Sequence, residues 1–132
     1  MKKSPKRSIL LFSEKLLVKP LSVNEAWQGR KFKTDKYKKY EELLLMMLPD
    51  IAIDFDKQPL ELFIEVGFSN KASDIDNVIK PFVDILQKKY DFNDKYIYRL
   101  LVEKKDVSRG DEYIEFYLRI LRPEFYHTDD LE

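Results

Sequence analysis

The chain has 132 residues and a formal net charge of zero, and its content of 44% hydrophobic and 14% aromatic residues suits one folded domain and argues against bulk disorder. It contains no cysteine, which excludes disulfides, thiolate zinc sites and cysteine nucleophiles, and its one histidine, His127, excludes mechanisms that need several. Three glycines are too few for a glycine-rich loop that cradles phosphate.

The first half of the chain is expected to hold a strand, a long loop and a helix. Residues 8–18 have the apolar pattern of a strand, and residues 19–34 are rich in the Pro, Ser, Asn and Gly that are typical of loops. Apolar residues recur at helical spacing over residues 35–48, which predicts a helix. Asp35 is placed to cap the start of this helix, and Pro49 is placed to end it.

The second half is expected to hold three strands and a second helix. Residues 60–68 alternate between apolar and polar, which predicts a half-buried strand, and residues 74–90 carry one apolar helical stripe. Residues 96–103 and 112–121 have strand patterns, and the short polar connection between them predicts an antiparallel hairpin. The order β-α-β-α-β-β therefore predicts a single α+β domain, with two main helices packed on one mixed β-sheet.

The whole chain, residues 1–132, is interpreted as one domain with two polar ends. Residues 1–7 are basic and residues 126–132 are polar and acidic, so both ends are expected to be flexible tails. No stretch approaches the ~18 apolar residues of a membrane helix. The apolar run near the N-terminus is also too short for a signal peptide. We therefore expect a cytoplasmic protein.

Positive charge is concentrated in residues 1–40, which carry 12 Lys/Arg and three Asp/Glu, a net charge of +9, whereas residues 41–132 carry −9. Such asymmetry suggests an anionic partner for the basic part, and a solvated helix face is the alternative. Trp27, Phe32 and Tyr37 lie among the cations and could either stack on bases or anchor the core. The candidate DNA contacts in this segment are Arg30, Lys31, Lys33, Lys36, Lys38 and Lys39.

Three of these cations, Lys36, Lys38 and Lys39, lie near the start of the first predicted helix. The helix dipole disfavours cations there by about 0.3–1 kcal/mol each at low salt, so stability alone would favour the opposite end. A phosphate bound at the helix start would use both the lysines and the free amides. This placement therefore favours a nucleic-acid partner.

Two carboxylates, Asp74 and Asp76, lie at the start of the second helical region. The structural interpretation is a helix cap, because Ser73 and Asp76 approximate a capping box and Asp76 can pair with Lys80 at i, i+4. Pro81 disfavours a continuous helix, so the helix either kinks near Lys80 or begins after Ser73. In both cases the two carboxylates lie in or before a first turn, where they can converge on one cation.

A magnesium site of the nuclease type needs two or more carboxylates, with water and substrate phosphate as the other ligands. A third carboxylate is available in the turn after the second helix, where Asp94 or Asp91 is the candidate and an ordinary Asn-Asp turn is the alternative. Glu61 and Glu65 share one face of the predicted strand at 60–68. This face is expected to be solvated, and a position near the metal is the alternative.

The carboxylates belong to a longer pattern. From Asp74 to Leu86 the sequence is Asp-x-Asp-Asn-x-x-Lys-x-x-x-Asp-x-Leu, with Asn93-Asp94 downstream, and it is preceded by Pro20-Leu21-Ser22-Val23-Asn24 and by the basic segment 30–39. In this order the features resemble the RusA-like Holliday junction resolvases, endodeoxyribonucleases that are common on phages and prophages. The resemblance covers residues 12–121.

The resemblance implies a homodimer that binds a four-way DNA junction and makes paired symmetric cuts in DNA recombination and repair, with Mg²⁺ as cofactor and Mn²⁺ able to substitute. It matches Asp74, Asp76 and Asp94 with catalytic, metal-binding carboxylates and Lys80 with a catalytic lysine. Asp91 remains the alternative to Asp94, because the match needs a one-residue deletion. Lys71, the one cation just before Asp74, is a further candidate DNA contact.

Two alternatives stay open. The first is a non-catalytic DNA-binding module of the same fold, in which the carboxylates are structural. The second is a nuclease of the same fold that prefers other branched DNA, such as flaps or forks. A protein-interaction domain would leave the lysines at the helix start and the carboxylate pattern unexplained.

Overall fold

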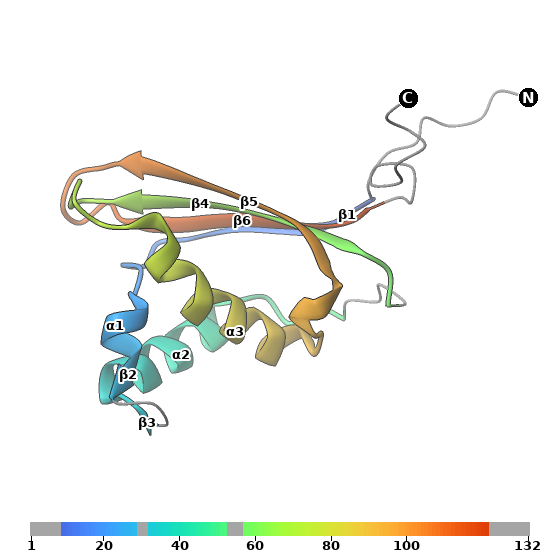
Figure 1. Ribbon diagram of the computed structural model, residues 1–132, viewed down its shortest axis with the longest axis horizontal. Coiled ribbons are helices and arrows are strands. Elements are labelled where there is room, and N and C mark those ends of the chain that lie inside the picture. Colours follow the sequence, from blue (N-terminus) through green and yellow to red (C-terminus); the bar gives the residue numbers. More distant parts are fainter. Residues whose placement is uncertain (1–8, 29–31, 53–56, 122–132) are drawn as a thin grey trace, which may run out of the picture.

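A four-stranded sheet forms one layer of the molecule, and the helices lie against one of its faces (Figure 1). The computed structural model describes residues 9–28, 32–52 and 57–121, so both predicted tails, and His127, lie outside the described residues. The sheet strands are β1 (Ile9–Leu16), β4 (Leu60–Phe68), β5 (Ile97–Asp106) and β6 (Tyr113–Ile120). The other elements are α1 (Val23–Ala26), β2 (Trp27–Gln28), β3 (Phe32–Lys33), α2 (Asp35–Met47), the 3₁₀ turn η1 (Ile75–Val78), α3 (Ile79–Tyr90) and the 3₁₀ turn η2 (Asp94–Tyr96).

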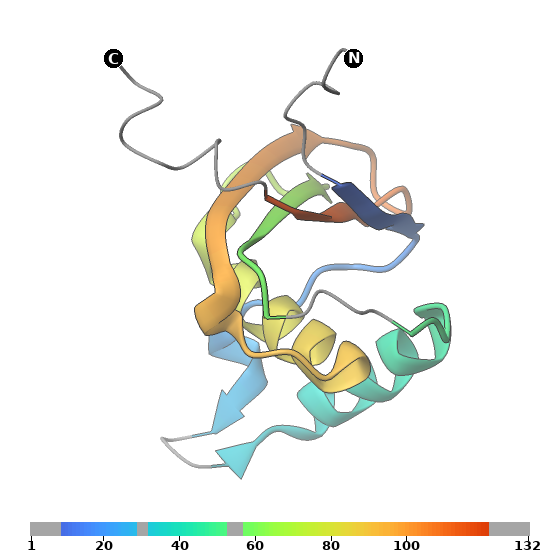
Figure 2. The same ribbon diagram turned by 90° about the vertical axis from the view of Figure 1, so that its right-hand side faces the viewer.

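The strands lie in the order β1-β6-β4-β5, with β5 parallel to β4 and the other neighbours antiparallel. Figure 2 shows β1 and β5 at opposite edges of the sheet. The predicted mixed sheet in an α+β domain is confirmed. The predicted hairpin between residues 96–103 and 112–121 is wrong, because β4 lies between β5 and β6. Their connection instead crosses the end of β4, where Val107 N donates to Phe68 O at 2.8 Å.

The segment expected to be a loop, residues 19–34, contains the short helix α1 and the two-stranded ribbon β2–β3. It ends at Thr34, which caps α2 in place of the predicted Asp35, because Thr34 Oγ1 accepts from Tyr37 N at 3.1 Å. Thr34 Oγ1 also donates to Glu25 O, which ties the end of α1 to the start of α2. The helix itself ends before Pro49, as predicted.

The core lies between the sheet and the layer formed by α2 and α3. Phe116 of β6 is 1% exposed, and its ring makes edge contacts with Phe12 of β1 and Phe82 of α3, at centroid distances of 5.3 Å for both. Apolar residues of β4 at alternate positions point into the same core, so one strand face and two helices share a single apolar cluster. No helix in the described part of the chain has the length and apolar character needed to cross a membrane.

No helix of the described residues lies on the opposite face of the sheet (Figure 1). Glu61 lies on this face and is only 4% exposed, so the expectation that it is solvated is wrong. Its carboxylate accepts from Arg99 Nη1 at 3.3 Å and from Tyr117 Oη at 3.2 Å, and Tyr117 stacks on Phe63. Long side chains from the neighbouring strands therefore cover Glu61 and supply its hydrogen bonds.

Candidate nuclease site

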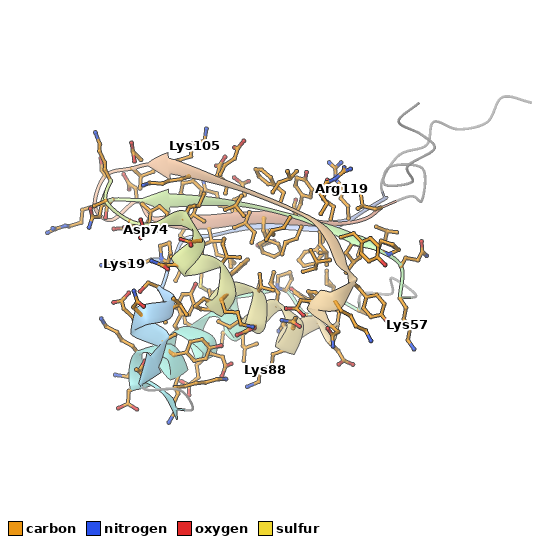
Figure 3. The ribbon with its side chains drawn as sticks, viewed as in Figure 1. Lys19, Lys57, Asp74, Lys88, Lys105 and Arg119 are labelled. Atoms are coloured by element: carbon orange, nitrogen blue, oxygen red, sulfur yellow. The ribbon has the colours of Figure 1, made fainter. Side chains whose placement is uncertain are left out.

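A cleft with a volume of about 1050 Å³ lies at one end of the sheet. Three segments enclose it: the stretch leading into α1, the loop between β4 and η1, and the connection between β5 and β6. Asp74 and Lys19 lie at this end of the molecule, opposite Lys57 (Figure 3). The cleft is lined by Lys19, Pro20, Ser22, Asn24, Glu25, Phe68, Ser69, Asn70, Lys71, Ala72, Ser73, Asp74, Asn77, Val78, Arg109, Gly110 and Glu112.

The loop before Asp74 is held in place by backbone contacts. Asn70 closes a turn, because its Oδ1 accepts from Ala72 N at 2.9 Å and its backbone O accepts from Ser73 N at 3.0 Å. Lys104 of β5 donates to Lys71 O and to Ser73 O, each at 2.8 Å. These bonds hold the loop against β5, and the loop in turn fixes the position of Asp74 at its end.

Asp74 occupies the N-cap position of η1, but its carboxylate makes no capping hydrogen bond. Asp74 Oδ2 instead accepts from the side-chain amide of Asn77 at 3.3 Å. Asp76 follows in the first turn of η1, and both aspartates are exposed. Both carboxylates therefore lie at the start of the helical region, and the carboxylate of Asp74 makes no hydrogen bond that caps the helix.

Lys80 lies in the first turn of α3 and pairs with Asp84 at 3.0 Å rather than with Asp76. Its side chain is 61% exposed, and it does not line the cleft.

The helix α3 begins at Ile79, after Ser73, which is the second of the two geometries that Pro81 allows. Pro81 is tolerated there because the amides of a first turn have no intrahelical acceptor.

Asp94 lies at the other end of α3, at the start of η2. Its backbone N donates to Gln87 Oε1 at 2.8 Å, and Asn93 caps the turn. Asp91 is at the same end, as the left-handed C-cap of α3. The 12 residues of α3 span about 18 Å. In the part of the chain that the structure describes, no three His, Asp or Glu side chains lie close enough to hold a metal ion, so Asp94 does not join Asp74 and Asp76 within one chain.

Two cations among the described residues of the basic segment have acidic partners within the chain. Lys36 pairs with Glu25 at 2.8 Å, and its hydrogen bond lowers the pKa of the Glu25 carboxyl. Lys33 lies 3.8 Å from Glu41 and above the ring of Tyr37. The ion pair with Glu25 thus offsets the unfavourable position of Lys36 at the start of α2.

The remaining members of the segment divide into exposed lysines and residues that are not described. Lys38 and Lys39 are exposed on α2, and Arg30 and Lys31 lie outside the described residues. Tyr37 is 1% exposed and anchors the core, and this burial raises the pKa of its hydroxyl. The side chains of Trp27 and Phe32 are likewise not described.

A family model described as endodeoxyribonuclease RusA matches residues 19–116. The chain belongs to the RusA endodeoxyribonuclease family. A search among curated proteins found no match. The region matched to RusA begins in the wall of the cleft and includes Asp74, Asp76, Lys80 and Asp94. Membership of the RusA family implies the nuclease activity of a Holliday junction resolvase.

The cleft of this RusA-family chain gathers cations that are far apart in the sequence. Lys19 and Arg109 line it together with Lys71, but nothing in the sequence marked the first two, because only the fold brings them together. The cleft also contains three carboxylates, those of Glu25, Asp74 and Glu112.

Glu112 adds a firmly ionised group to the cleft. Its carboxylate accepts from Ser69 Oγ at 2.6 Å and from Gly110 N at 3.0 Å, and the hydroxyl hydrogen bond lowers the pKa of the carboxyl. Three cations and three carboxylates leave the lining close to neutral. A divalent cation bound at the carboxylates would therefore make the net charge of the cleft positive and favour the binding of phosphate.

Proposed function

We propose that the protein is a Mg²⁺-dependent endonuclease that acts as a homodimer and resolves four-way DNA junctions by paired symmetric nicks. The single observation that carries the proposal is the family match over residues 19–116, within which Asp74 lines the cleft and Asp76 follows it in the sequence. The near-neutral charge of that cleft further supports a metal requirement, because neutral walls attract the DNA backbone weakly.

Asp74 and Asp76 suit Mg²⁺ as ligands. Both are exposed carboxylates, and Mg²⁺ in phosphate-processing sites is commonly held by one or two carboxylates with waters and substrate phosphate. Mn²⁺ favours the same oxygen ligands and can substitute. When bound, such an ion polarises a phosphoryl oxygen and lowers the pKa of a coordinated water.

The cations around these carboxylates have two roles in the proposal. Lys19, Lys71 and Arg109 hold the DNA backbone in the cleft, with the lysines of α2 extending the contact surface. Lys80 stabilises the negative charge that develops on the scissile phosphate. Lys80 reaches that position by exchanging its exposed ion pair with Asp84 for the phosphate.

Arg109→Gln is expected to weaken junction binding several-fold and to reduce the salt dependence of log K by about one unit, the loss of one phosphate contact. Fluorescence anisotropy over a series of salt concentrations measures both quantities. Lys57→Gln is the matched control, because Lys57 is exposed at the opposite end of the molecule (Figure 3). Equal salt dependences for the two variants would remove Arg109 from the binding surface.

The proposed activity is tested on a labelled synthetic four-way junction, with matched duplex and flap substrates, in Mg²⁺ or in EDTA. Symmetric nicks on the junction alone that disappear in EDTA are the expected result. Equal or faster cutting of flaps would favour a nuclease for other branched DNA. Junction binding without cleavage in Mg²⁺ or Mn²⁺ would favour a non-catalytic module, with structural carboxylates.

A further inference from the structure

Lys104 of β5 is a half-buried lysine whose ammonium group bonds to the loop that leads into Asp74. Its Nζ donates to Lys71 O and to Ser73 O, each at 2.8 Å, and lies 5.6 Å from the centre of the Phe68 ring. Hydrogen bonds from a charged donor are about twice as strong as those between neutral groups. Lys104 therefore holds this loop more firmly than an uncharged side chain would.

The two carbonyls lie at either end of the part of the loop that carries charged groups into the cleft. Ser73 O belongs to the peptide bond between Ser73 and Asp74, and Lys71 O lies two residues earlier. Lys71 and Asp74 both line the cleft, the first as a proposed contact for the DNA backbone and the second as a proposed Mg²⁺ ligand. One ammonium group thus fixes a cation and a carboxylate of the cleft relative to β5.

The start of the same loop is held to the sheet by other contacts. Ser69 Oγ donates to Glu112 at 2.6 Å, and Val107 N donates to Phe68 O at 2.8 Å. The hydrogen bonds of Asn70 to Ala72 and Ser73 are internal to the loop, so they shape it without attaching it to a strand. Lys104 adds the bonds that join the second half of the loop to β5.

Lys104 does not line the cleft, so any effect on the site passes through the loop. It lies on the face of the sheet that carries the helices, because its partner on β4 is the buried Val66. The next residue, Lys105, pairs with Gly67 and is exposed on the opposite face (Figure 3). β5 therefore carries two adjacent lysines, one of which bonds to the loop while the other faces away from it.

We propose that Lys104 is a positioning residue of the nuclease site, which sets the place of Asp74 for Mg²⁺ and of Lys71 for the DNA backbone by holding Lys71 O and Ser73 O. The inference rests on the proposed nuclease function. Residues that orient a metal ligand typically contribute about 10–100-fold to metal affinity or activity. A lysine that only stabilised the fold would leave the affinity for metal unchanged in protein that stays folded.

Metal binding without DNA tests this role separately from cleavage. Lys104→Met keeps the aliphatic stem but removes the ammonium group, and it is expected to weaken Mn²⁺ binding about tenfold. The electron paramagnetic resonance signal of free Mn²⁺ measures the affinity. Lys105→Met, which removes the same charge from the neighbouring residue, is the matched control and should bind Mn²⁺ as the wild type does. Equal affinities for the two variants would overturn the positioning role.

The mobility of the loop gives a second readout. In Lys104→Met, NMR relaxation is expected to show order parameters of the backbone amides at 71–74 falling from about 0.85, typical of rigid backbone, toward 0.6 or below. The amides of α3 should keep their wild-type values, which also confirms that the variant is folded. A loop that stays as rigid as in the wild type would overturn the role of Lys104.

Chemical rescue distinguishes loss of the ammonium group from general damage at this position. The chain has no cysteine of its own, so bromoethylamine alkylates only the thiol of Lys104→Cys. A C–S bond forms, bromide and the thiol proton leave, and the product is a side chain of lysine-like length that ends in an ammonium group. The alkylated protein is expected to recover most of the wild-type Mn²⁺ affinity. No recovery, while Lys105→Cys treated in the same way binds normally, would contradict the proposal.

The outcomes separate the inference from the proposed function. A wild-type protein that cuts junctions, together with a Lys104→Met protein that binds Mn²⁺ and cuts equally well, overturns the positioning role and leaves the nuclease function in place. A wild-type protein that cuts no branched DNA with Mg²⁺ or Mn²⁺ overturns the proposed function. In that case the order parameters still decide whether Lys104 holds the loop.

Discussion

Asp74→Asn is expected to lower the rate of junction cleavage by at least about a hundredfold, more than the loss typical of residues that only support a metal ligand. The substitution removes the charge of a proposed Mg²⁺ ligand but keeps the size of the side chain. Asp74 is exposed and makes no capping hydrogen bond, so the fold should be unaffected. The same substitution should leave junction binding in EDTA unchanged or slightly tighter, because one negative charge leaves the cleft.

Single-turnover cleavage in Mg²⁺ measures this loss, and the melting temperature of each variant checks the fold. Asp111→Asn is the matched control, because Asp111 is an exposed aspartate of the connection between β5 and β6 that does not line the cleft. The control should cut at the wild-type rate. A cleavage rate for Asp74→Asn within a few-fold of the wild type would exclude Asp74 from the metal site.

Phe116→Ala is expected to reduce the free energy of unfolding by about 3–5 kcal/mol, the usual cost of truncating a buried phenylalanine. Phe116 is 1% exposed, and its ring joins β1 to α3 through Phe12 and Phe82. The alanine leaves a cavity at the point where the sheet packs on the helical layer. Urea denaturation followed by circular dichroism measures the change.

The control for this variant is Phe116→Leu, which keeps most of the apolar volume and should cost far less. If the alanine variant lost less than about 1 kcal/mol, the cost of a typical single substitution, the packing of β6 against α3 would be wrong.

Sequence patterns predicted the main elements of this fold well, since their apolar periodicity reports burial of one face. The alternation over residues 60–68 corresponds to β4, and the helical spacing over residues 35–48 corresponds to α2. Strand pairing was harder to predict. A short polar connection between two strands favours a hairpin, but β4 pairs with both of them and so lies between. The order of strands depends on packing across the whole sheet, and this packing cannot be predicted from the sequence of each strand and its connections alone.

In the candidate site too, residues close in the sequence could be predicted, whereas residues brought together by the fold could not. Asp74 and Asp76 are two residues apart, and both lie at the start of η1, before α3, as the sequence predicts. Lys19 and Arg109 are 90 residues apart in the sequence, and the fold places both in the lining of the cleft. Asp94 shows the converse, because a sequence motif places it with Asp74 and Asp76, whereas α3 separates them within one chain. Motif spacing carries no information about how far apart the fold places the residues of the motif.

A supercoiled plasmid that extrudes a cruciform tests whether this RusA-family protein resolves junctions by coordinated cuts, as we propose. Two nicks within one binding event convert the plasmid directly to the linear form, whereas independent nicks accumulate as nicked circles. Linear product is expected in Mg²⁺, with none in EDTA and none from a matched plasmid without the cruciform. Nicked circles alone, or equal cutting of both plasmids, would contradict it.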